Sequence, residues 1–89
     1  MIEQSLDVIN KLGLHARAAA KVVSVASRYD SAIHVLHKGN RIDAKSIMGL
    51  LMLGAAKGSQ VTFQVEGDDE DAAMAELEDL FARMFDEGE

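Results

Sequence analysis

The chain has 89 residues, 48% of them hydrophobic and 27% charged, which suits one globular domain spanning residues 1–89 and is too apolar for a disordered chain. The lack of cysteine excludes disulfides and thiolate metal sites, and no apolar segment approaches the ~20 residues of a membrane span. The net charge of −6 argues against nucleic acid as the main partner, and the first residues show no secretion signal, so we expect a cytoplasmic protein.

Hydrophobic periodicity predicts seven secondary-structure elements. In chain order these are a strand at 2–9, a helix at 16–28, strands at 32–37 and 41–43, a short helix at 47–53, a strand at 60–66 and a last helix that starts near residues 68–71. The strands alternate between apolar and polar residues, so one face of the sheet is expected to be wet. The expected class is α+β: an open-faced β-sandwich whose four-stranded, mainly antiparallel sheet is covered on one face by three helices.

The helical period also predicts which residues face the core. For the first helix they are Ala19, Val22, Val23 and Ala26. For the last helix they are Ala73, Leu77, Leu80, Phe81 and Met84. His34 and His37 lie three residues apart on one predicted strand, so they face opposite sides and cannot share a metal ion. We interpret each as a lone surface histidine.

The segment KLGLHARAAAKVV, residues 11–23, concentrates the most informative chemistry. His15 stands where a loop turns into a helix, and Arg17 follows two residues later. A helix start presents unpaired N–H groups and a partial positive charge, so it attracts anions. This placement predicts that phosphate is handled through the imidazole. At this position we expect the imidazole to accept a hydrogen bond from the N–H of Arg17. In the other interpretation His15 is only a helix cap, but histidine is a poor cap beside Ser, Thr, Asp or Asn.

The short helix 47–53, IMGLLML, is apolar on almost every side. Ser46 precedes it as the expected N-cap, and Gly54 is the expected terminator. We expect Leu50 and Leu53 to enter the core. A single-layer sandwich cannot bury the remaining large side chains as well, namely Ile47, Met48, Leu51 and Met52. Exposed apolar groups indicate a partner surface, and methionines suit several partners; deeper burial of Leu51 and Met52 is the open alternative.

Two segments resemble the signature motifs of HPr, the histidine phosphocarrier family of the bacterial phosphoenolpyruvate-dependent phosphotransferase system. They are GLHARA, Gly13–Ala18, and DAKSIMGLLMLGAAKGSQV, Asp43–Val61. The resemblance covers essentially the whole chain, and the βαββαβα order is similar to the family fold. It implies that His15 is phosphorylated on Nδ1 by phospho-enzyme I and passes the phosphoryl group to an enzyme IIA. Arg17 and the backbone of Ala16 would steady the phosphate, without cofactor or metal.

The resemblance also implies a partner surface and a regulatory site. The partner surface is expected to comprise Ala16, Arg17, Ala20, Ile47, Met48, Leu51 and Met52. Ser46 matches a serine that an HPr serine kinase/phosphorylase modifies in some relatives. We expect a monomeric, stoichiometric carrier that is not itself an enzyme. The alternative is a small non-phosphorylated regulatory or ligand-binding α+β module in which His15 only caps a helix.

Two further features concern the branch and the charge. Ala18 stands where the family usually has proline, which we expect to affect local rigidity and rate but not the chemistry. LLMLGAAKG and the acidic tail LFARMFDEGE, residues 80–89, resemble the nitrogen-related branch, NPr, more than the sugar-uptake form. Residues 1–65 hold eight of the nine basic residues and only four acids, so this part is suited to acidic partners.

Overall fold

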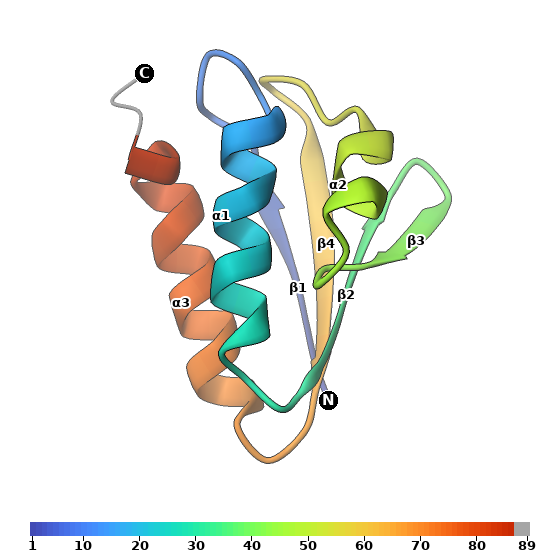
Figure 1. The fold of residues 1–89 in the computed structure, drawn as a ribbon, viewed down its shortest axis with the longest axis vertical. Coiled ribbons are helices and arrows are strands. Elements are labelled where there is room, and N and C mark those ends of the chain that lie inside the picture. Colours follow the sequence, from blue (N-terminus) through green and yellow to red (C-terminus); the bar gives the residue numbers. More distant parts are fainter. Residues whose placement is uncertain (87–89) are drawn as a thin grey trace.

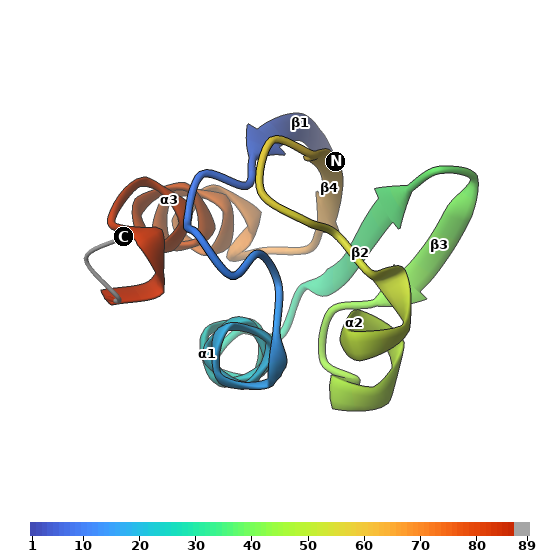
Figure 2. The same ribbon diagram turned by 90° about the horizontal axis from the view of Figure 1, so that it is seen from above.

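The computed structural model describes residues 1–86 as a four-stranded sheet with three helices on one of its faces (Figures 1 and 2). The elements are β1 (Ile2–Asp7), α1 (Ala16–Ser27), β2 (Ala32–His37), β3 (Asn40–Asp43), α2 (Ile47–Leu53), β4 (Gln60–Glu66), α3 (Glu70–Ala82) and the 3₁₀ turn η1 (Met84–Asp86). The strand order is β1-β4-β2-β3, and every neighbouring pair is antiparallel. The predicted open-faced α+β sandwich is therefore confirmed.

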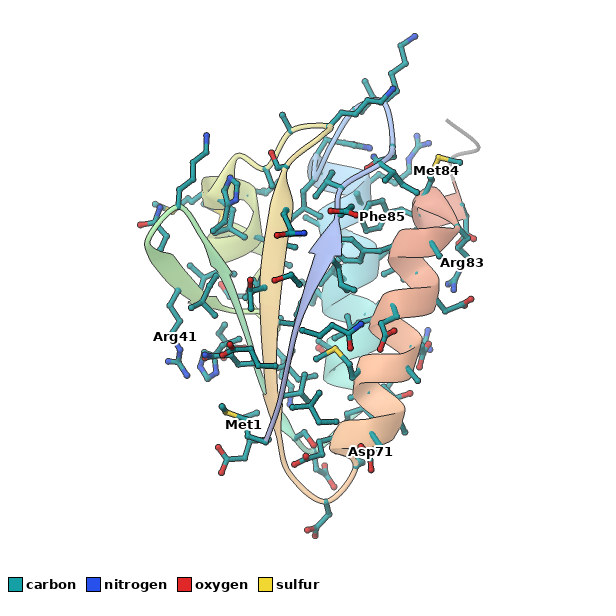
Figure 3. All side chains as sticks on the ribbon, turned by 180° about the vertical axis from the view of Figure 1, so that it is seen from behind. Met1, Arg41, Asp71, Arg83, Met84 and Phe85 are labelled. Carbon is teal, nitrogen blue, oxygen red and sulfur yellow. The ribbon has the colours of Figure 1, made fainter. Side chains whose placement is uncertain are left out.

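The two faces of the sheet differ as the alternation of the strands predicts. The inner face packs buried Val61, Phe63 and Val65 of β4 beneath the helices. The outer face carries cross-strand polar pairs instead, of which the shortest joins Gln64 Nε2 to Glu3 Oε1 at 2.7 Å. Arg41 continues this row, because its Nε donates to Gln64 Oε1 at 3.1 Å (Figure 3). The outer face thus satisfies its own polar groups and needs no covering layer.

The C-terminal end of α3 corrects the predicted core. The helix ends at Ala82, so Met84 is not on its buried stripe. Phe85 is the buried residue instead, and its ring lies 4.8 Å from that of Phe81, edge to face. Figure 3 shows Phe85 between the end of α3 and the sheet. A left-handed turn with positive φ values from Met84 to Asp86 swings Phe85 inward, which a continued helical period does not anticipate.

The same turn ties the C-terminal segment to α1. Asp86 accepts hydrogen bonds from Arg83 Nε at 2.8 Å and from Lys21 Nζ at 3.2 Å. These two cations lower the pKa of the Asp86 carboxyl, Lys21 having the larger influence. The ion pairs are exposed, so they orient the turn while burial of Phe85 anchors it.

Other predictions need smaller corrections. β1 stops at Asp7 instead of continuing to residue 9. On α1, Val25 is buried and Val23 is only half-buried, because the side of the helix that carries Val25 packs against α3. His37 is not a surface residue: it is 7% exposed, and its Nδ1 lies 3.3 Å from the carbonyl of Gln60. It lies on the inner face of β2, two residues beyond Val35.

Asp69 joins the loop between β4 and α3 to the loop between α1 and β2, at the end of the molecule opposite His15. Its carboxylate accepts hydrogen bonds from the backbone N–H groups of Asp30 at 2.9 Å and Ser31 at 3.0 Å, and from the Ser31 hydroxyl. It occupies the N-cap position of α3 without capping it through its side chain. The Ser31 hydroxyl, with the N–H of Asp30, holds the pKa of the Asp69 carboxyl below its ordinary value of 3.8.

This lowered pKa predicts an acid-dependent loss of stability. The ionised carboxylate contributes fully above its unfolded pKa, and the contribution is lost as the pH falls through the lower folded pKa. We expect Asp69→Asn to lower the melting temperature near neutral pH and to reduce its fall on acidification. Asp71→Asn, which removes an exposed carboxylate from the first turn of α3 (Figure 3), is the matched control. Equal melting curves for both variants would contradict the role of Asp69.

Candidate functional site at the start of α1

Two loops joined by backbone hydrogen bonds hold the start of α1. Val8 N donates to Ser59 O and Gly58 N donates to Val8 O, both at 2.8 Å. Closer to the helix, Leu14 N donates to Ala55 O, also at 2.8 Å. Figure 1 shows the loops before α1 and after α2 meeting at one end of the molecule. The residue that follows Leu14, His15, is therefore placed by segments about 40 residues apart in sequence.

Gly13 makes this arrangement possible. Its φ is +67°, a left-handed conformation that side chains rarely adopt, and Asn10 Nδ2 donates to its carbonyl at 2.8 Å. A Cβ at this position would lie 2.7 Å from Ala55 O and 2.9 Å from Ala56 Cα. The chain passes so close to its neighbour that only glycine fits. Sequence reasoning identified Gly13 only as part of a motif, because this contact is made by a distant segment.

Gly13→Ala is expected to destabilise the protein by roughly 2–4 kcal/mol, the sum of left-handed strain and a steric clash with backbone. Gly54→Ala is the matched control, because Gly54 has a similar φ of +63° and open space around it. It should lose about 1–2 kcal/mol, from strain alone. Urea unfolding of both variants measures the difference, and equal losses would show that the Ala55 contact is unimportant.

His15 occupies the N-cap position of α1 but does not cap the helix with its side chain. Its backbone is extended, with φ −82° and ψ −176°, and its carbonyl accepts the first helical hydrogen bond from Ala19 N at 2.8 Å. The predicted bond from the N–H of Arg17 to the imidazole is wrong, because no side-chain capping bond is made. The imidazole ring is half-buried at the helix start and makes no capping hydrogen bond. The interpretation of His15 as only a helix cap therefore has no capping bond to support it.

The neighbours of His15 on α1 divide between solvent and core. Ala16, Arg17 and Ala20 are exposed, and Ala18 and Ala19 are completely buried. Ala18, the third residue of the helix, contributes its methyl group to the core. The exposed stripe of α1 therefore begins beside His15.

α2 lies beside α1 and presents the second part of the predicted surface (Figure 2). Ser46 caps it as expected, with its Oγ accepting from Gly49 N at 3.2 Å, and Gly54 ends it in a left-handed conformation. Leu50 and Leu53 are buried. Met48 is 64% and Met52 79% exposed, and Ile47 and Leu51 are exposed to a lesser extent, with 38% and 39%. Deep burial of Leu51 and Met52, the alternative, is therefore wrong.

The electrostatics of the helix starts favour an anion at α1. The first turn of α3 contains Glu70 and Asp71, which complement the positive end of that helix. The first turns of α1 and α2 contain no acidic residue. The positive end of α1 therefore meets His15 and Arg17 without a carboxylate in the turn, a setting that suits a transient dianionic group.

Two further observations concern the described residues as a whole. Within residues 1–86, no group of three or more His, Cys, Asp or Glu side chains is arranged to hold a metal ion. No helix in that range is long and apolar enough to cross a membrane.

Comparison with known proteins agrees with this geometry. Residues 2–83 match the family model described as the PTS HPr component phosphorylation site. The chain belongs to the HPr family. It is 48% identical to the phosphocarrier protein HPr of Neisseria meningitidis serogroup A and 47% identical to that of Cupriavidus necator, with complete coverage of each pair. The crystal structure of HPr-C-His from Thermoanaerobacter tengcongensis superposes with a TM-score of 0.94 at 44% identity, covering 98% of both chains.

Membership of the HPr family decides between the two functions that the sequence left open. The chain is a histidine phosphocarrier of the phosphotransferase system, and the non-phosphorylated module is set aside. Residues 87–89 of the acidic tail lie outside the described residues. The resemblance of residues 80–89 to the nitrogen-related branch thus rests on their sequence.

Proposed function

We propose that His15 is the phosphoryl acceptor of this carrier. In this mechanism, Nδ1 of His15 attacks the phosphorus of phospho-enzyme I, a new P–N bond forms, and the bond to the donor breaks. In the second step, a nucleophile of an enzyme IIA attacks the same phosphorus, a new bond to the acceptor forms, and the P–N bond to His15 breaks. The observation that carries the proposal is an imidazole at the N-cap that does not serve as a cap, beside exposed Arg17.

The start of α1 would hold the phosphoryl group without trapping it. The N–H groups of the first turn and the helix dipole would stabilise a dianion by about 1–3 kcal/mol, and a charge-assisted bond from Arg17 would add about as much. Ala16 and Arg17 are exposed, so water competes for the phosphate. A carrier needs such moderate stabilisation, because a phosphate locked in a buried cage would not be passed on.

The partners would dock on one continuous surface formed by α1 and α2. We call this surface the docking face and define it as Ala16, Arg17, Ala20, Ile47, Met48, Leu51 and Met52. Its apolar part would be buried against enzyme I and enzyme IIA in turn, and Arg17 would lie at its edge next to the phosphate. Sequential use of one face means that donor and acceptor compete and do not bind together.

Several finer features belong to the same proposal. The protein would act as a single phosphocarrier domain over residues 1–89, as a cytoplasmic monomer that is a stoichiometric carrier and not an enzyme. The acceptor would be an enzyme IIA of the sugar type or, as residues 80–89 suggest, of the nitrogen-related type. No cofactor, nucleic acid or membrane takes part in this scheme.

Phosphorylation by enzyme I tests the assignment. Incubation with phosphoenolpyruvate and enzyme I should add the mass of one phosphate, labile to acid, and His15→Ala should abolish the gain. His34→Ala is the matched control, because His34 is a half-buried histidine on the sheet, away from α1, and should leave the gain unchanged. A mass gain that persists in His15→Ala would refute the assignment, provided that the enzyme I is active on another carrier.

Ser46 is proposed as a regulatory phosphorylation site for an HPr serine kinase/phosphorylase. Phosphate on this exposed N-cap would be tolerated by the helix start and would place negative charge beside the docking face. We expect Ser46→Asp to slow phosphorylation by enzyme I several-fold at unchanged stability, because Asp caps as well as Ser. Ser46→Ala should instead lose about 1 kcal/mol of stability and keep the rate. Equal rates for all three proteins would contradict the proposed effect.

A further inference from the structure

The methionines of this protein are unevenly exposed. Met74 is 2% exposed within the core, and Met84 is half-buried in the C-terminal turn. Met48 and Met52 project from α2 and are among the most exposed large apolar side chains of residues 1–86. Two such thioethers on one short helix are accessible to dissolved oxidants in the free protein.

Their spacing places both sulfurs on one side of α2. Residues four apart lie above one another on a helix, so Met48 and Met52 form a continuous strip with Leu51 beside it. Met52 also lines a hollow of about 170 Å³ between α2 and β3, with Ile42 and Leu53 among its walls. Met48, Leu51 and Met52 are thus three of the four large apolar side chains of the docking face.

We propose that Met48 and Met52 are a reversible oxidation site through which hydrogen peroxide weakens docking of the phosphotransfer partners. The inference rests on the proposed function, because it requires the docking face to be buried in the transfer complexes. In each reaction, peroxide transfers one oxygen atom to the thioether sulfur and leaves as water, and the sulfur loses two electrons. Methionine sulfoxide reductases return the sulfoxide to the thioether with two electrons from a dithiol, and the oxygen leaves as water.

The exposure of both side chains separates the effect on docking from the effect on folding. In the free carrier, water hydrates the new sulfoxide oxygen, so the folded state loses little. In a transfer complex, the same oxygen would be buried against an apolar partner surface, where an unmatched polar group is unfavourable. Oxidation thus converts the strip from an attractive to a repulsive contact without unfolding α2, whose core contacts are made by Leu50 and Leu53.

The test oxidises the carrier alone. The protein is treated with hydrogen peroxide, catalase removes the excess, and the initial rate of phosphorylation by enzyme I and phosphoenolpyruvate is measured at low carrier concentration. Mass spectrometry of peptides reports which methionines carry oxygen. We expect the rate to fall about tenfold or more in step with oxidation of Met48 and Met52. The circular dichroism melting curve should be nearly unchanged, and reductase treatment should restore the rate.

The double variant Met48→Leu, Met52→Leu is the matched control, because leucine keeps the volume and apolar character but cannot be oxidised in this way. Its own rate before treatment is the reference, and the variant should keep that rate after peroxide. Met84→Leu should give no protection. If peroxide slows the double variant as much as the wild type, or leaves the wild-type rate unchanged, the inference is wrong. If untreated wild type accepts no phosphate from active enzyme I, the proposed function itself fails.

Discussion

Arg17→Ala should slow phosphorylation of the carrier by enzyme I about a hundredfold, the typical effect of removing one donor that stabilises charge in a transition state. Arg17 is exposed on the first turn of α1, two residues after His15, so its guanidinium can follow the phosphoryl group as it arrives and departs. Its removal leaves only the N–H groups and the dipole of the helix to stabilise the dianion. Rapid-quench measurement of single-turnover transfer gives the rate directly.

Two further variants separate this role from general effects of charge. Arg17→Lys keeps the positive charge but loses the planar fork, so its rate should lie between those of the wild type and Arg17→Ala. Arg28 is the C-cap of α1 and pairs with Glu76, far from His15. Arg28→Ala removes this cation, and its rate should change less than twofold. A rate within twofold of wild type for Arg17→Ala would contradict the proposed phosphate contact.

Phe85→Ala is expected to give the largest loss of stability, about 3–5 kcal/mol, as is typical of removing a fully buried aromatic ring. Phe85 is completely buried and packs edge to face on Phe81, whose ring in turn lies 5.6 Å from that of Phe63. Loss of the first ring therefore opens one end of the aromatic row. It also frees the left-handed turn that carries Asp86 to Lys21. Urea unfolding followed by circular dichroism measures the change.

Met84→Ala is the control for this prediction, because Met84 shares the left-handed backbone of the turn but is only half-buried. Its loss should be less than about 1 kcal/mol. The folded fraction of Phe85→Ala should accept phosphate at the wild-type rate, since α3 and η1 lie on the side of α1 away from α2 (Figure 2). A loss below about 1 kcal/mol for Phe85→Ala would show that η1 is not anchored by its ring.

The elements that could be predicted from sequence are those with local causes. The limits of α2 follow from Ser46 and Gly54, whose capping roles depend on the backbone of the adjacent turn alone. The inner and outer faces of β4 follow from strict alternation over seven residues. The same alternation in β2 places His37 on the inner face with Ile33 and Val35. The burial of His37 could therefore be predicted from this period of two.

The positions of the candidate residues along the chain could be predicted from sequence, but the geometry around them could not. His15 at a helix start and the apolar surface of α2 both follow from periodicity and from the preferences of helix ends. That the imidazole makes no capping bond, and that Gly13 lies against the backbone of Ala55 and Ala56, depend on where a distant loop passes. Sequence patterns do not encode such approaches, because they arise only when the whole sheet is assembled.

The helix and strand order, the apolar composition of α2 and the histidine at the start of α1 are properties of short segments, so the sequence alone predicts them. Only the tertiary structure decided the contacts between segments far apart in the chain. The left-handed turn that buries Phe85, and the link from Asp69 to Asp30 and Ser31, are two examples. The physical reason is that such conformations are unfavourable or unspecified locally and are stabilised only by burial and hydrogen bonds that the complete fold supplies.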